Sequence, residues 1–258
     1  MSKRKASVKS YDFLKRKFPY FMMNLFFLFS TVMIVTSSAN PRMMIPPLHY
    51  DNQIAYFSNN ESKKLRVDVY YESMCPDSKN FIQNTLAAIM PSFASFMSVT
   101  LIPFGKAETV QISPQFQFRC QHGPEECEGN LFHNCAQKYI SNDVKRVGFV
   151  SCLFNDIFNV KMNWQNTAKQ CSIREGVESY FASIFNCAID LEGRQLHHQA
   201  GQRTGKKHFI PTVEISIGGR ESGKVVLDTR DKVTNLKPMV CDLYLKLHGE
   251  PFEPCIYS

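Results

Sequence analysis

The stretch Cys75-Pro76-Asp77-Ser78 joins a strand-like run to a helix-like run, and the prediction of the fold begins from this junction. Residues 65–71 (Leu-Arg-Val-Asp-Val-Tyr-Tyr) alternate apolar and polar side chains, which is the period of a strand. Residues 79–90 place apolar side chains at helical spacing, and we expect this helix to end at Pro91. The sequence therefore predicts a cysteine at a strand-to-helix junction.

A cysteine at such a junction is well placed to attack a disulfide. The attacking species is the thiolate, which unpaired N–H groups and the helix dipole favour at a helix N-terminus. Pro76 suits the first helical position, and Ser78 could donate a hydrogen bond to the sulfur. The Asp77 carboxylate opposes these effects by raising a neighbouring thiol pKa. We therefore expect Cys75 to be a reactive thiol without an extreme pKa.

The order of the other elements predicts the fold class. Residues 99–104 predict a second strand, parallel to the first across the intervening helix. Signals from about 120 to 204 are helical and rich in cysteine, and residues 212–217 and 224–228 then predict a hairpin. An amphipathic helix over 240–247 follows. This order indicates an α/β, thioredoxin-like fold with a helical, disulfide-rich insertion.

Pro211 stands just before the third predicted strand. In thioredoxin folds the loop facing the active cysteine carries a cis-proline at this point. Only about 5–6% of X–Pro bonds in folded proteins are cis, so the residue alone is weak evidence. Its position favours a cis bond over a trans turn, and we place Pro211 in the candidate site with Cys75 and Ser78.

Residues 1–39 carry most of the excess positive charge. The chain has 258 residues, 30 bases and 23 acids; this segment holds seven of the bases and one acid, so the remainder has 23 bases and 22 acids. A nearly neutral remainder gives no indication of a nucleic-acid partner. The whole chain has 44% apolar and 21% charged residues, which suits a globular protein with a sizeable core.

The same segment predicts a secretory signal peptide. A basic head precedes an apolar run over residues 18–35, and Ser37-Ser38-Ala39 supplies the small residues of a cleavage site. An uncleaved signal anchor is the alternative, since the run approaches the length of a membrane span. After cleavage we expect no membrane attachment. Residues 40–63 are predicted to be a linker or propeptide-like segment, with a sequon at Asn60, and residues 64–258 the functional domain.

All nine cysteines lie beyond residue 39. A secretory route makes them disulfide candidates, and eight can pair in any of 105 connectivities while one is left over. Besides Cys75, the structural candidates are Cys120, Cys127, Cys135, Cys152, Cys171, Cys187, Cys241 and Cys255.

Zinc is the alternative at Cys120–Cys135, which also contains His122. The irregular spacing and the secretory route favour disulfides there, so we expect no bound metal. His197 and His198 fall on a predicted helix, where we expect a solvated face rather than a pair of ligands.

Several motifs together resemble the gamma-interferon-inducible lysosomal thiol reductase family. They are Tyr70-Tyr71-Glu72-Ser73-Met74-Cys75, the Cys-Gln-His-Gly-x-x-Glu-Cys-x-x-Asn-x-x-x-x-Cys signature from Cys120 to Cys135, Ile210-Pro211 with Gly218-Gly219, and Val240-Cys241-Asp242-Leu243-Tyr244 followed by Cys255. The resemblance implies a glycoprotein, secreted or in the endosomal–lysosomal lumen, that reduces protein disulfides at acidic pH. It also implies a Cys-x-x-Cys pair and no bound cofactor.

Cys75 matches the family's nucleophile, whereas Ser78 departs from the pattern at the resolving position, as in arthropod members. Ser is a poor nucleophile without a neighbouring base, so an external small thiol or the substrate's second cysteine must resolve the mixed disulfide. Three hypotheses follow: a monothiol oxidoreductase or isomerase acting on protein disulfides, a binding or immune-effector module, and a structurally paired Cys75.

Overall fold

The computed structural model describes most of the predicted functional domain. The described residues are 64–111, 115–157, 163–217 and 224–256. The predicted signal peptide over 1–39, the linker over 40–63 with Asn60, and Gly218-Gly219 lie outside them.

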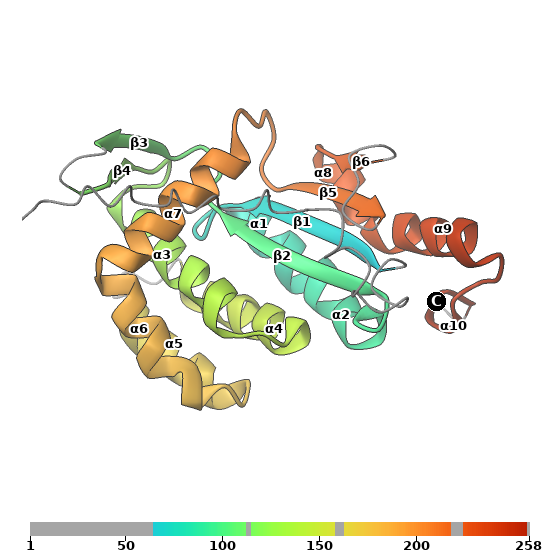
Figure 1. The fold of residues 1–258 in the computed structure, drawn as a ribbon, viewed down its shortest axis with the longest axis horizontal. Helices are drawn as coiled ribbons and strands as arrows, with labels where there is room; N and C mark the ends of the chain where they lie inside the picture. Colours follow the sequence, from blue (N-terminus) through green and yellow to red (C-terminus); the bar gives the residue numbers. More distant parts are fainter. Residues whose placement is uncertain (1–63, 112–114, 158–162, 218–223, 257–258) are drawn as a thin grey trace, which may run out of the picture. The chain divides into compact units, whose positions relative to one another are not determined.

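A four-stranded mixed sheet forms the centre of the described fold (Figure 1). Its strands are β1 (Leu65–Tyr71), β2 (Met97–Pro103), β5 (Thr212–Ile217) and β6 (Val225–Leu227), in the order β2-β1-β5-β6. β2 runs parallel to β1, while β5 is antiparallel to both β1 and β6. This pairing of a βαβ unit with a β-hairpin is the thioredoxin-like arrangement that the sequence predicts.

The helical run after Cys75 is longer than predicted. It consists of α1 (Pro76–Asn80), the π-helical segment η4 (Phe81–Leu86) and α2 (Ala87–Phe93). The predicted end at Pro91 is wrong, because this proline lies inside α2. An interior proline costs about 3 kcal/mol, but Met90 and Phe93 on either side are each 1% exposed, and their burial offsets part of this cost.

A block of helices lies between the two halves of the sheet in sequence (Figure 1). It contains α3 (Pro124–Tyr139), α4 (Asp143–Leu153), η5 (Phe154–Asp156), α5 (Trp164–Arg174), η6 (Glu178–Tyr180), α6 (Phe181–Ile189) and α7 (Leu191–Thr204). α3 contacts α6, α7 and β2, so it connects the block to the sheet. Its position beside the sheet explains how side chains of the insertion reach the loop before Cys75.

The remaining elements are short or terminal. A two-stranded hairpin, β3 (Glu108–Gln111) with β4 (Gln117–Arg119), follows β2, and α8 (Arg230–Thr234), α9 (Leu236–His248) and α10 (Glu253–Ile256) end the described chain. Among the described residues, no helix combines the length and the apolar character needed to cross a membrane.

Candidate thiol site

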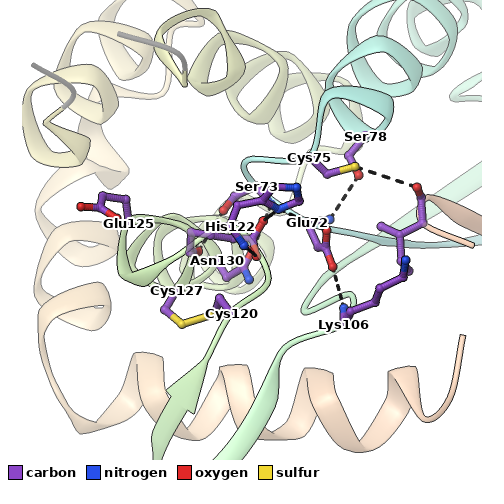
Figure 2. Close-up of polar contacts among 12 residues, drawn as sticks. Glu72, Ser73, Cys75, Ser78, Lys106, Cys120, His122, Glu125, Cys127 and Asn130 are labelled. Atoms are coloured by element: carbon purple, nitrogen blue, oxygen red, sulfur yellow. Dashed lines mark hydrogen bonds and ion pairs between the residues drawn. A yellow bond between two sulfur atoms is a disulfide. The ribbon is translucent and has the colours of Figure 1, made fainter. Parts of the chain in front are cut away.

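Cys75 lies at the N-cap of α1, directly after the loop that leaves β1. It is the one free cysteine of the nine, and all nine fall within the described residues. Its side chain is buried, and its Sγ lies 3.9 Å from the carbonyl oxygen of Ile210 (Figure 2). The Ile210–Pro211 bond is cis, as the position before β5 predicts. The fold thus brings Cys75 and Pro211 together from distant parts of the sequence.

The loop before Cys75 is fixed by one side chain and one backbone carbonyl of α3. The backbone N–H of Ser73 donates to Asn130 Oδ1 at 3.0 Å, and the Ser73 hydroxyl donates to the Glu126 carbonyl at 3.0 Å. All three residues are buried, so each bond is made away from water. A buried polar group left unpaired costs about 1–3 kcal/mol, which keeps the loop in one conformation and holds the thiol in place.

Ser78 is completely buried, and its hydroxyl oxygen accepts the backbone N–H of Glu72 at 3.2 Å. This contact ties the first turn of α1 back to the end of β1 (Figure 2). Among the described residues, no histidine or carboxylate forms a hydrogen bond with this hydroxyl that would activate it as a nucleophile. Ser78 therefore serves the structure of the site and does not replace a resolving thiol.

The pKa of Cys75 is raised above its ordinary value, mainly by burial of the thiol. Hydrogen bonds from the backbone and side chain of Ser78 lower it, the Glu72 charge raises it, and the Asp77 backbone lowers it. The Asp77 carboxylate, which we expected to raise this pKa, is not among the main causes of the shift. That carboxylate instead pairs with Arg230 at 2.9 Å. Stabilisation of the thiolate by the helix N-terminus is outweighed by desolvation.

A second polar group lies beside the loop before Cys75. Glu72, His122 and Glu126 bring one potential ligand atom each to within 4.8 Å of one another. Burial is the main cause that raises the pKa of Glu72, followed by the charge of Glu126. Only two weak signals of this cluster are present in the sequence: Glu72 directly follows an apolar strand, and His122 is a zinc candidate.

The eight other cysteines form four disulfides. They are Cys120–Cys127, Cys135–Cys187, Cys152–Cys171 and Cys241–Cys255. No thiolate of the Cys120–Cys135 segment is therefore left to bind zinc, so the sulfur-based alternative is excluded by the pairing. Cys120–Cys127 closes a loop around His122, and the other two pairs within 135–187 cross-link the helical block.

The expectation of a solvated face at His197 and His198 is wrong for the first residue. His197 is completely buried, and its Nδ1 lies 3.2 Å from the Pro103 carbonyl oxygen. Burial lowers its pKa to about 3, so it is neutral. His198 is partly buried, with its Nδ1 3.2 Å from the Thr109 hydroxyl. The reason is that α7 packs against β2 and β3 instead of facing water.

A single buried thiol at a strand-to-helix junction, facing a cis-proline before the third strand of the sheet, defines a thioredoxin-fold protein with a one-cysteine site. Comparison with known proteins narrows this class. The sequence model described as "Gamma interferon inducible lysosomal thiol reductase (GILT)" matches residues 66–175. GILT-like protein 1 of Drosophila melanogaster is 31% identical over 189 residues, covering 69% of this chain and 74% of that protein. The chain belongs to the GILT family.

Other similar proteins extend beyond insects. The gamma-interferon-inducible lysosomal thiol reductase of Carassius auratus is 28% identical over 183 residues, which cover 69% of this chain and 68% of that protein. Among solved structures, reduced DsbA1 from Neisseria meningitidis aligns with a TM-score of 0.47 and 11% identity, over 73% of this chain and 88% of that one.

Proposed function

We propose that this chain is a thiol–disulfide oxidoreductase that acts on protein disulfides, with Cys75 as its nucleophile. One observation carries the proposal: eight cysteines are paired, and the ninth is free at the N-cap of α1, 3.9 Å from the Ile210 carbonyl oxygen before the cis Pro211. Membership of a family described as a thiol reductase supports the same chemistry.

In the first step, the Cys75 thiolate attacks one sulfur of a substrate disulfide. The new bond joins Cys75 Sγ to that sulfur, the substrate S–S bond breaks, and the other substrate sulfur leaves as a thiolate that takes up a proton. The product is a mixed disulfide, and no net oxidation has yet occurred. The raised pKa of Cys75 lowers the thiolate fraction available for this step.

In the second step, an external small thiol must act because Ser78 cannot. Its thiolate attacks the mixed disulfide and releases the reduced substrate, and a second molecule of the thiol regenerates Cys75. In total two small thiols are oxidised to one disulfide while one substrate disulfide becomes two thiols. When the thiol that left in the first step attacks instead, the original disulfide forms again; when another cysteine of the substrate attacks, Cys75 is released with no net reduction and the result is isomerisation. The chemistry requires no bound cofactor.

We assign this activity to a secreted protein or one of the endosomal–lysosomal lumen, with disulfide-containing proteins as partners and no nucleic-acid ligand. Four structural disulfides support an oxidising route during folding. The proposal includes cleavage of the signal peptide at residues 1–39, glycosylation at Asn60 and a functional domain over 64–258.

A second candidate is a binding or immune-effector module that captures partners through a stable mixed disulfide. The observation in its favour is that the fully buried hydroxyl of Ser78 accepts a hydrogen bond from the Glu72 N–H, so the site has no internal resolving group. The two candidates differ in one property, namely whether a small thiol releases the captured partner at a useful rate.

The direct test is reduction of insulin disulfides with a small thiol as reductant. Cys75→Ala should reduce the rate to that of the small thiol alone, while Ser78→Cys should raise it by supplying a resolving thiol. Ser78→Ala is the matched control for Ser78→Cys, because it changes the same position without adding sulfur. Full activity in Cys75→Ala would exclude the proposed nucleophile. Absence of turnover with every small thiol, combined with retained capture of partners, would favour the second candidate.

A further inference from the structure

Two buried carboxylates converge on one imidazole beside the loop before Cys75. His122 Nδ1 lies 2.5 Å from a carboxylate oxygen of Glu126 and 3.5 Å from one of Glu72. The three groups come from the end of β1, the loop after β4 and the first turns of α3. Glu72 and His122 lie next to each other in Figure 2, whereas the neighbouring Glu125 is directed away from them.

The two carboxylates of this cluster do not form an ion pair with a lysine or arginine side chain among the described residues. The side chains of Glu72 and Glu126 are 1% and 0% exposed. Among the described residues, His122 is the only group that forms an ion pair with either carboxylate, and the Lys106 charge acts on Glu72 from a longer distance, where it lowers the pKa of that carboxyl. Buried carboxylates are normally paired with cations or coordinate metals. One imidazole facing two carboxylates leaves room for a further positive charge.

Backbone groups also orient the carboxylates. The Lys106 N–H donates to one oxygen of Glu72 at 2.6 Å, and the other oxygen faces His122. The His122 N–H donates to one oxygen of Glu126 at 3.2 Å, and the second oxygen meets the imidazole. Outer hydrogen bonds of this kind orient the ligands of metal sites. The Cys120–Cys127 disulfide closes the loop that carries His122 and Glu126.

We propose that Glu72, His122 and Glu126 bind a divalent transition-metal ion, with Zn²⁺ the best match to one nitrogen and two carboxylate ligands. Zinc sites with three protein ligands keep a fourth position for water, and the 29% exposed side chain of His122 gives access from solvent. Zn–ligand bonds of about 2.0–2.2 Å suit the 3.5 Å spacing between Glu72 and His122. The 2.5 Å contact of His122 with Glu126 must widen to about 3.4 Å, the ligand spacing of a tetrahedral site, as the metal replaces its proton.

This site differs from the zinc site weighed from the sequence, because it uses no cysteine. It is also independent of the proposed reductase activity, since none of its ligands is Cys75. Because the ligands must be deprotonated, binding should weaken as the pH falls from neutral towards the values at which carboxylates and imidazoles protonate.

Calorimetric titration of the untagged, disulfide-intact protein with Zn²⁺ at pH 7 tests the proposal. We expect one ion per chain, and at least about tenfold weaker binding in His122→Gln and Glu126→Gln. His208→Gln and Glu125→Gln are matched controls at exposed positions and should bind as the unmodified protein does. Cys75→Ala should also retain binding, which separates this site from the free thiol.

A folding control accompanies each variant: intact mass without reduction, to verify four disulfides, and circular dichroism. His122 is partly exposed, so its variant is the one most certain to fold if Glu126→Gln does not. Absence of saturable binding, binding unchanged in His122→Gln, or loss of binding in Cys75→Ala would each overturn the proposal. Insulin reduction measured on the same preparations shows separately whether the proposed function holds.

Discussion

At the scale of single residues, the thiol of Cys75 experiences opposing effects. Its place at the start of α1 and the hydrogen bonds of Ser78 favour the thiolate, while burial and the Glu72 carboxylate disfavour it. Burial is the largest of these, so the site holds its nucleophile mainly in the thiol form. A nucleophile that is mainly in the thiol form is consistent with a slow attack on the substrate disulfide. An external thiol is still needed to complete the cycle, because Ser78 cannot resolve the mixed disulfide.

The raised pKa predicts how alkylation of Cys75 depends on pH. Iodoacetamide reacts with the thiolate, so the rate rises with pH until the thiol is fully ionised. Because burial disfavours the charged form, we expect the half-maximal rate of the native protein at a higher pH than that of the same protein unfolded in guanidinium with its disulfides intact. Mass spectrometry of the labelled peptide measures both rates. A native curve displaced to lower pH would show that the helix N-terminus dominates instead.

At the scale of elements, the strands could be predicted better than the helices. β1 and β5 have the predicted bounds because their alternating side chains face a core on one side, whereas the β3–β4 hairpin was missed because its residues are exposed or only partly buried. α5 lies within the predicted helical block although its sequence has few apolar residues, and Cys152–Cys171 attaches it to α4. The positions of Cys75 and Pro211 could be predicted because both are set by local sequence. The cluster at Glu72 could not, because it depends on how three distant segments pack.

The turn between β2 and β3 provides an element-scale prediction. Gly105 has φ +58°, and a Cβ there would lie 2.1 Å from Glu72 Cγ. Gly105→Ala should therefore destabilise the protein by about 2 kcal/mol or more, through backbone strain and displacement of Glu72.

Gly205→Ala is the matched control. Gly205 has φ +55° but no atom within 4 Å of an added Cβ, so only backbone strain of about 1–3 kcal/mol applies, without the contact that Gly105→Ala makes with Glu72. Urea denaturation of both variants measures the two costs. Equal losses in the free energy of unfolding would show that the contact with Glu72 adds no cost, because the turn shifts to accommodate the new Cβ.

At the scale of the whole molecule, three of the four disulfides lie in or beside the helical block, while the thiol site is at its border with the sheet. Cys135–Cys187 joins α3 to α6 across 52 residues and is the longest connection. The block in turn supplies Asn130 and the Glu126 carbonyl that fix the loop before Cys75. The insertion therefore supports the geometry of the site.

Removal of individual disulfides should show which of them contributes most to stability. In the chain-entropy account, stabilisation grows with the length of the closed loop. Replacing both cysteines of Cys135–Cys187 by alanine should cost about 4 kcal/mol of stability, against about 2 kcal/mol for Cys120–Cys127, which spans 7 residues. Chemical denaturation without a reductant measures both. A larger loss from the short loop would contradict a predominantly entropic role.

The role of Cys75 as the nucleophile can be tested by trapping the mixed disulfide. The purified protein is reacted with a disulfide-containing peptide, and intact and peptide-level mass spectrometry locate the adduct before and after addition of a small thiol. We predict one adduct, on Cys75 alone, that persists until the small thiol is added and then disappears with release of the reduced peptide. An adduct on any other cysteine, or one that resolves at the same rate without a small thiol, would contradict the account.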